Sequence, residues 1–269
     1  MPKVVFITGG SSGIGKSIGE YLSDKGYTVY GTSRNPSRIS EKLPFTLLQM
    51  DVCNLESIEK ATSIIIANEG NIDVLINNAG VGITGPIEET PNSEIAKAFE
   101  TNYYGPLNVI KAVLPQMRKQ GSGKIVNISS IAGYMGLPYR GVYCATKAAL
   151  EITTEAYRME IKQFGIEMVN VAPGDFATNI AAGRYHAPVL SDSPYQKAYG
   201  KTLSVMNAHV AEGENPLQMA KVVHAIIEKS KPRIHYKVGA PLQKFSIVLK
   251  RILPDKIYER MLLQHYKLK

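Results

Sequence analysis

Short apolar runs rich in β-branched residues alternate along the chain with segments whose apolar residues recur every three or four positions. The first kind of run is typical of buried strands, and the second spacing is typical of helices that bury one face. The pattern begins with a strand over residues 3–8 and a helix over residues 13–25 that stops at Gly26. Further strands are predicted at 27–32, 45–50, 72–76, 124–128, 166–171 and 234–238. Further helices are predicted at 55–68, 92–117 (one or two helices), 142–164 and 216–229.

The repeated order of strand and helix predicts an α/β fold in which helices cover both faces of a parallel sheet. Because crossovers are right-handed, we expect the doubly wound Rossmann fold, as a single domain over residues 1–269. Ligands of such sheets bind beyond the carboxyl ends of the strands. The pattern breaks over residues 175–215, where weak periodicity predicts a substrate lid. Residues 240–269 are predicted to form a basic, amphipathic helical extension at the C-terminus.

A glycine-rich turn follows the first predicted strand and opens the first helix. It reads Thr8-Gly9-Gly10-Ser11-Ser12-Gly13-Ile14-Gly15. Glycines allow a tight turn and let a pyrophosphate approach the backbone N–H groups at the helix N-terminus. The same segment also satisfies the P-loop pattern G-x-x-x-x-G-K-[ST] through Lys16 and Ser17. A P-loop nucleoside triphosphatase, with Asp51 helping to hold Mg²⁺, is therefore the alternative from a different class.

Five further motifs follow in order along the chain. They are Asn77-Asn78-Ala79-Gly80, Asn102 within Asn102-Tyr103-Tyr104-Gly105, Ser130 thirteen residues before Tyr143, Tyr143-x-x-x-Lys147, and Pro173-Gly174-x-x-x-Thr178. With the glycine-rich turn, they match the TGxxxGxG, NNAG, helix-asparagine, serine-to-tyrosine, YxxxK and PGxxxT patterns of the short-chain dehydrogenase/reductase family. The chain resembles that family over about residues 3–180 by motif and over nearly its whole length by size. The resemblance implies an oxidoreductase that transfers a hydride between a nicotinamide cofactor and a carbonyl or secondary alcohol.

Tyr143 and Lys147 are four positions apart, which places both on one face of a helix. A tyrosine has a pKa of about 10, and a nearby ammonium lowers it, so the pair is a candidate proton donor at neutral pH. The resemblance implies that Tyr143 exchanges a proton with the substrate oxygen and that Lys147 binds the nicotinamide ribose. It also implies that Ser130 donates a hydrogen bond to that oxygen. Asn102 is then expected to hold a helix irregularity and a proton-relaying water, and Ser129 to be structural.

The end of the second predicted strand indicates NADP(H) as the cofactor. NAD sites place an acidic residue there for the ribose 2′-hydroxyl, but residues 31–38 hold no acid and contain Arg34 and Arg38. A guanidinium suits a 2′-phosphate, and Arg34 resembles the family's NADP-selecting arginine. The predicted cofactor-binding residues are Gly9, Ser11, Ser12, Gly13, Ile14, Gly15, Arg34, Asp51, Val52, Asn78, Ala79, Gly80, Tyr143, Lys147, Pro173, Gly174 and Thr178. No metal site is predicted.

Apolar and aromatic side chains near the predicted catalytic residues favour a hydrophobic small-molecule substrate that is steroid-, retinoid- or lipid-like. They are Met135, Leu137, Pro138, Tyr139, Phe176, Tyr185, Tyr195, Tyr199, Leu203 and Met206. The alternative on the same fold is a non-catalytic NADP-binding regulator. The intact set of Asn102, Ser130, Tyr143 and Lys147 argues against it, since a regulator needs no proton donor.

The net charge of +8 is concentrated at the C-terminal end. Residues 231–269 hold ten Lys/Arg and two Asp/Glu, so the first 230 residues carry no net charge. No nucleic-acid motif accompanies this basic segment, so no nucleic-acid partner is predicted. We expect the extension to close the substrate pocket or join a subunit interface, with weak contact to an anionic membrane surface as the alternative. Two cysteines and no long apolar run predict a cytoplasmic protein, and the resemblance implies a homodimer or homotetramer.

Overall fold

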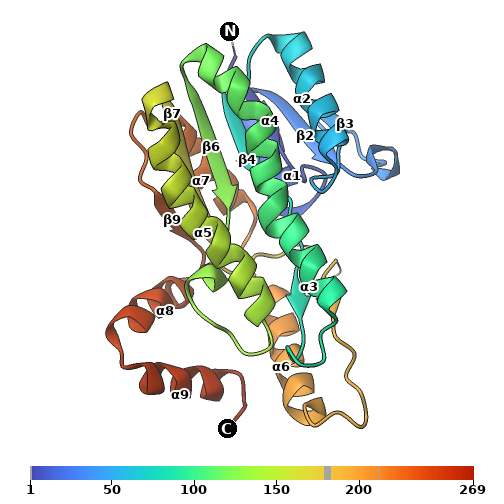
Figure 1. The fold of residues 1–269 in the computed structure, drawn as a ribbon, viewed down its shortest axis with the longest axis vertical. Coiled ribbons are helices and arrows are strands. Elements are labelled where there is room, and N and C mark those ends of the chain that lie inside the picture. The colour runs from blue at the N-terminus through green and yellow to red at the C-terminus, as the bar shows by residue number, and fades with distance from the viewer. Residues whose placement is uncertain (1, 179–182, 212) are drawn as a thin grey trace.

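Parallel strands form a seven-stranded sheet with helices on both faces (Figure 1). The computed structural model describes residues 2–178, 183–211 and 213–269. The strand order is β3-β2-β1-β4-β6-β7-β9. This order is that of the doubly wound dinucleotide-binding folds with one strand added at the edge. The predicted fold class is therefore confirmed.

The strands and helices outside the predicted lid lie within a few residues of their predicted positions. The sheet strands are Val4–Ile7 (β1), Thr28–Ser33 (β2), Thr46–Gln49 (β3), Val74–Asn77 (β4), Gly123–Ile128 (β6), Ile166–Pro173 (β7) and His235–Val238 (β9). The α-helices are Gly13–Asp24 (α1), Leu55–Glu69 (α2), Asn92–Phe99 (α3), Gly105–Gln120 (α4), Gly141–Ile161 (α5), Gln196–Ala211 (α6), Leu217–Glu228 (α7), Pro241–Ile252 (α8) and Asp255–His265 (α9).

Alternate residues of each strand pack on opposite faces of the sheet. Val4 and Phe6 belong to a buried cluster shared with residues of α2 and α4. Val5 and Ile7 belong to a second cluster, shared with residues of α1 and α7. Because both faces are covered, the strands are continuous apolar runs rather than alternating ones. This is the physical reason that their positions are visible in the sequence.

The strand order reverses direction at β1. Val5 of β1 pairs with Val29 of β2 on one side and with Val74 of β4 on the other. At such a reversal, the connections on either side run to opposite faces of the sheet and leave a crevice beyond the carboxyl ends of the strands. The predicted motifs follow β1, β2, β4, β6 and β7 in the chain. The fold therefore brings them together at this crevice.

The segment 92–117, predicted as one or two helices, forms the two helices α3 and α4, which are separated by a π-helical segment, Glu100–Tyr104 (η2). Within the predicted lid, residues 196–211 form helix α6, and Tyr185–His186 (β8) pairs in parallel with Ile83–Thr84 (β5). The Tyr199 side chain is only 1% exposed, and its hydroxyl donates to the Thr84 backbone oxygen at 3.2 Å. Lid residues 179–182 and 212 lie outside the described residues.

A buried carboxylate ties β6, α5, β7 and β9 together. Glu151 of α5 accepts hydrogen bonds from Ser129 and, at 2.8 Å, from the Tyr134 hydroxyl. It also accepts one from the Asn170 amide at 3.0 Å, and it lies 2.8 Å from His235 Nδ1. The predicted structural role of Ser129 is consistent with this network.

We expect Glu151→Ala to lower the free energy of unfolding by about 3–5 kcal/mol, because its buried donors lose their shared acceptor. For a chain of this size that corresponds to a Tm decrease of roughly 6–20 °C in thermal unfolding. The control is Glu155→Ala. Glu155 contacts the other nitrogen of His235 at 2.9 Å, but its side chain is 53% exposed, so we expect a change below about 1 kcal/mol. An equal Tm decrease for Glu151→Ala and Glu155→Ala would contradict the stabilising role of this network.

Candidate active site

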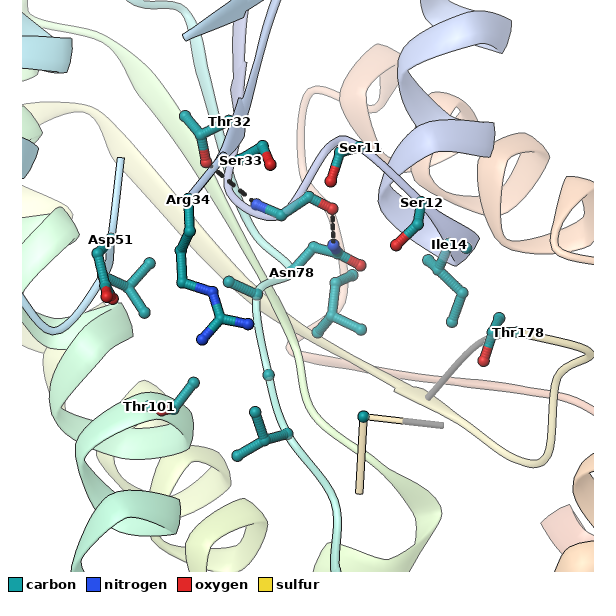
Figure 2. Close-up of a pocket in the computed structure, with 18 of the residues that line it drawn as sticks. Ser11, Ser12, Ile14, Thr32, Ser33, Arg34, Asp51, Asn78, Thr101 and Thr178 are labelled. Atoms are coloured by element: carbon teal, nitrogen blue, oxygen red, sulfur yellow. Dashed lines mark hydrogen bonds between the residues drawn. The ribbon is translucent and has the colours of Figure 1, made fainter. Parts of the chain in front are cut away.

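The glycine-rich turn is shaped by backbone geometry and by two side chains. Gly9 has a φ of +67°, a conformation that side chains disfavour. Its N–H donates to the Thr32 hydroxyl at 3.2 Å, and its carbonyl accepts from the Asn78 amide at 3.0 Å (Figure 2). A Cβ on Gly15 would lie 2.3 Å from the Gly9 oxygen. The turn therefore requires glycine at both positions to bring the start of α1 against β4.

A cavity of about 530 Å³ lies above this turn. Its walls include fifteen of the seventeen predicted cofactor-binding residues, namely Gly9, Ser11, Ser12, Gly13, Ile14, Arg34, Asp51, Val52, Asn78, Ala79, Gly80, Tyr143, Lys147, Pro173 and Thr178. Gly15 and Gly174 do not line it. Gly15 packs beneath the turn against Asn78, and a Cβ on Gly174 would lie 2.0 Å from the Gln243 side chain. Both glycines are thus closely packed, Gly174 lines the second cavity instead, and their contact with the cofactor stays a prediction.

The far end of this cavity is basic. Arg34, which follows β2, is exposed and extends into the cavity between Asp51 and Asn78 (Figure 2). Arg38 and Ser33 line the same end. The carboxylate that NAD sites place at the end of this strand is replaced by Ser33 and Arg34. The cavity thus fits a dinucleotide whose pyrophosphate lies at the α1 N-terminus.

Lys16 does not behave as a P-loop lysine. Its ammonium forms ion pairs with Glu20 at 3.7 Å and with Glu41, and it does not line the cavity. A P-loop lysine would reach the β- and γ-phosphates. The geometry therefore removes the main support for the nucleoside triphosphatase alternative.

Tyr143 separates two cavities. Its side chain lines the cofactor cavity and also a second cavity of about 530 Å³. Lys147, one turn further along α5, lines only the first cavity, whereas Ser130 lines only the second. The structure thus brings Ser130, Tyr143 and Lys147 together. Ser130 lies on the side of the second cavity, Lys147 lies on the side of the cofactor cavity, and Tyr143 lies between them.

Burial controls the electrostatics of this junction. Tyr143 is 9% exposed, and its burial raises the pKa, while Arg140, a hydrogen bond with Ser130 and Arg184 oppose the increase. Burial also lowers the pKa of Lys147 to about 8, and its ammonium donates to the Ile128 carbonyl at 3.0 Å. Arg140 and Arg184 are therefore among the charges that lower the Tyr143 pKa, and the predicted effect of Lys147 stays a prediction.

Asn102 stands at the centre of the π-helical segment and is fully buried. Its amide donates to the Val81 carbonyl at 2.8 Å and to the Thr146 hydroxyl at 3.2 Å, and its oxygen accepts from the Val81 N–H at 2.8 Å. It lines neither cavity. Asn102 therefore fixes the loop after β4 against α5, and its predicted part in a proton relay stays a prediction.

The second cavity has a charged end and an apolar end. The Arg140 guanidinium lies 5.5 Å from the centre of the Tyr143 ring, and Arg184 Nη1 is buried without a hydrogen-bond partner among the described residues. Asp175 also lines the cavity, with its carboxylate accepting from Gln243 at 2.6 Å. The apolar walls are Ile131, Ala132, Met135, Leu137, Phe176, Leu242, Leu249, Tyr258, Met261 and Leu262.

Helices α8 and α9 supply much of this apolar wall. The C-terminal extension therefore closes the pocket, which is one of the two roles predicted for it. Among the predicted pocket residues, Met135, Leu137 and Phe176 line the cavity. The predicted contribution of the lid aromatics is wrong for Tyr195 and Tyr199. Tyr195 donates to Glu88 instead, and Tyr199 packs beneath β5. Local composition could not separate cavity walls from packing positions.

Comparison with known proteins agrees with this geometry. The sequence profile described as short chain dehydrogenase matches residues 3–188. The chain belongs to the short-chain dehydrogenase family. A 3-ketodihydrosphingosine reductase of Bacteroides thetaiotaomicron is 38% identical, with 100% of this chain and 99% of the relative covered. A short-chain dehydrogenase structure from Streptomyces avermitilis is 30% identical with a TM-score of 0.85, covering 99% and 97% of the two chains. ElxO with NADP bound is also 30% identical, with a TM-score of 0.72 over 88% and 97%.

This short-chain dehydrogenase is accordingly an oxidoreductase of the nicotinamide-dependent kind. Sequence reasoning missed several residues around its cofactor cavity, namely Thr32, Asn35, Ile39, Met50, Cys53, Val81, Thr101, Ile128, Ser129 and Gly183. Ile128 ends β6, and its place at the carboxyl end of a strand was a usable signal. Thr101 lies on the π-helical segment, and nothing in the local sequence indicates that it faces the cavity.

Proposed function

We propose that this protein uses NADPH to reduce a ketone that carries a long apolar chain, and catalyses the reverse oxidation of the secondary alcohol. The observation that carries the proposal is the position of Tyr143 between the two cavities. A proton donor at this junction reaches the oxygen of a substrate in one cavity while its carbon faces a cofactor in the other. Proximity and orientation of this kind are a main source of enzymatic rate enhancement.

NADPH, when bound, supplies the hydride. Tyr143 donates a proton to the carbonyl oxygen, and Ser130 holds that oxygen from the substrate side. Lys147 binds at the cofactor side, where a hydrogen bond to the nicotinamide ribose would replace its contact with the Ile128 carbonyl. Arg34 favours the 2′-phosphate of NADPH, because its guanidinium has no ion pair among the described residues.

The second cavity supports an amphipathic substrate. At its charged end, Arg140 and Arg184 act on Tyr143, and Asp175 acts on both arginines, so this end suits a polar group next to the carbonyl. Its apolar end, between α8 and α9, suits an alkyl chain. A 3-keto sphingoid base has both parts, and the relative from Bacteroides thetaiotaomicron is named for reducing one. We therefore rank this substrate class above steroids and retinoids.

The test is NADPH consumption with 3-ketodihydrosphingosine and with analogues of decreasing chain length. We expect kcat/KM to decrease roughly fourfold for each methylene removed, since each buried methylene contributes about 0.8 kcal/mol. Steroid ketones and retinal serve as comparison substrates. Independence of chain length, or faster turnover of a compact ketone, would contradict the lipid assignment while leaving the reductase chemistry intact.

We also propose that the protein is a homodimer or homotetramer in the reducing environment of the cytoplasm. The cysteines support a reducing compartment, since Cys53 is exposed, Cys144 is buried, and both are free thiols. No helix among the described residues is both long and apolar enough to cross a membrane.

A further inference from the structure

One face of α8 is apolar and exposed, and we call it the α8 face. It consists of Leu242, Phe245, Val248 and Ile252, which are 72%, 51%, 43% and 66% exposed. At 100° per residue, these four side chains fall within about one third of the helix circumference. They therefore form a continuous apolar stripe rather than scattered contacts.

The opposite side of α8, which packs on the protein, holds polar as well as apolar residues. Gln243 binds Asp175, and Ser246 donates to the Gln243 carbonyl at 2.7 Å. Ile247 is the fully buried apolar residue of the helix. A surface helix of a soluble protein normally buries its apolar side and exposes its polar side. In α8, Ile247 and Leu249 pack inward together with Gln243, but the four apolar side chains of the stripe stay exposed. This exposure indicates that the stripe meets a further apolar phase.

The charges around the α8 face are positive. Lys244 and Arg251 lie beside one border of the stripe, by helix geometry. Lys250 lies on the side of Gln243 and pairs with Asp255 at 2.7 Å. Residues 240–269 contain seven Lys/Arg and two Asp/Glu, a net of +5, whereas the first 230 residues are neutral overall. An apolar helix face with a basic border is the pattern of helices that lie in the interface of anionic membranes.

The α8 face is continuous with the substrate cavity. Leu242 and Met261, 72% and 40% exposed, also line that cavity together with Leu249 and Leu262. Figure 1 shows α8 and α9 at the end of the molecule beyond the strands' carboxyl ends, apart from the helices that cover the sheet. An apolar chain would therefore pass from a lipid phase into the cavity, between these two helices, without being exposed to water.

We propose that the α8 face docks onto an anionic lipid surface and holds the mouth of the substrate cavity against it. Phe245 and Ile252 insert among the acyl chains, while Lys244 and Arg251 contact the anionic headgroups. The benefit of docking rests on the proposed function, because a long-chain ketone resides in membranes. The docking itself is independent of catalysis.

The test is co-sedimentation of the full-length protein with vesicles, without cofactor or substrate. Vesicles of phosphatidylcholine containing phosphatidylglycerol are compared with vesicles of phosphatidylcholine alone. We expect binding to the anionic vesicles that weakens as salt increases. The double variant Phe245→Glu/Ile252→Glu should reduce the bound fraction at least tenfold. The control, Leu55→Glu/Ile87→Glu, adds the same charge at residues 60% and 63% exposed elsewhere, and it should bind as the natural protein does.

Thermal unfolding and light scattering accompany the sedimentation. An unchanged Tm for Phe245→Glu/Ile252→Glu shows that lost binding is not lost folding. If the natural protein does not bind anionic vesicles, or if both double variants bind equally, the proposal is wrong. Conversion of an oligomer to a monomer by Phe245→Glu/Ile252→Glu alone would also overturn it and would identify the α8 face as a subunit interface. Because no turnover is measured, failure of the reductase assignment would leave these outcomes unchanged.

Discussion

Tyr143→Phe is expected to lower kcat by about 10²- to 10⁴-fold, the range that a positioned proton donor contributes, while NADPH binding is retained. The substitution removes one oxygen atom at the junction of the two cavities and keeps the buried ring beside Arg140. Steady-state turnover of the best ketone and NADPH affinity by fluorescence titration are the two measurements. Loss of kcat without loss of affinity assigns the hydroxyl to the chemical step.

The matched control for this substitution is Tyr103→Phe. The Tyr103 hydroxyl contacts the Thr153 hydroxyl at 3.1 Å, and the residue lines neither cavity, so turnover should be unchanged. Full activity in Tyr143→Phe would remove the proposed proton donor. Tight NADPH binding by the natural protein, with no turnover across the substrate panel, would instead favour the non-catalytic regulator.

Arg34→Asp is expected to exchange the cofactor preference. Loss of charge-assisted hydrogen bonds to the 2′-phosphate should weaken NADPH binding roughly 10- to 150-fold, from about 1.5–3 kcal/mol. The new carboxylate also repels that phosphate, whereas it can accept a hydrogen bond from the ribose 2′-hydroxyl of NADH. NADH affinity should therefore be unchanged or higher, as measured by the Kd of each nucleotide.

Arg233→Asp provides the same change of charge at an exposed position outside both cavities. It should affect both nucleotides little. If Arg34→Asp weakens the binding of NADPH and NADH equally, Arg34 does not recognise the 2′-phosphate. A requirement for NADH in the natural protein would contradict the cofactor assignment in a different way, and it would leave the proton-transfer prediction for Tyr143 unaffected.

The sequence determined those features that depend on neighbours in the chain. Buried strands and amphipathic helices show in the spacing of apolar residues, and a parallel sheet with its crevice follows from their order. The glycine-rich turn is local to β1 and α1, and the spacing of Tyr143 and Lys147 is fixed by one helix. For these reasons, the amino-acid sequence alone predicts that Ser130, Tyr143 and Lys147 meet at one edge of the sheet.

Only the tertiary structure decided which side of Tyr143 each partner occupies and what surrounds it. Gly174 packs against Gln243, 69 residues away in the chain, and Arg184 reaches Tyr143 from the segment after β7. The cavity walls from α8 and α9 and the exposed apolar stripe of α8 likewise depend on how the extension folds back. Such contacts depend on packing between distant segments, and the increase of the Tyr143 pKa depends on the burial that this packing creates. Apolar spacing indicates that a side chain avoids water, but it does not indicate whether a core, a substrate or a membrane replaces the water.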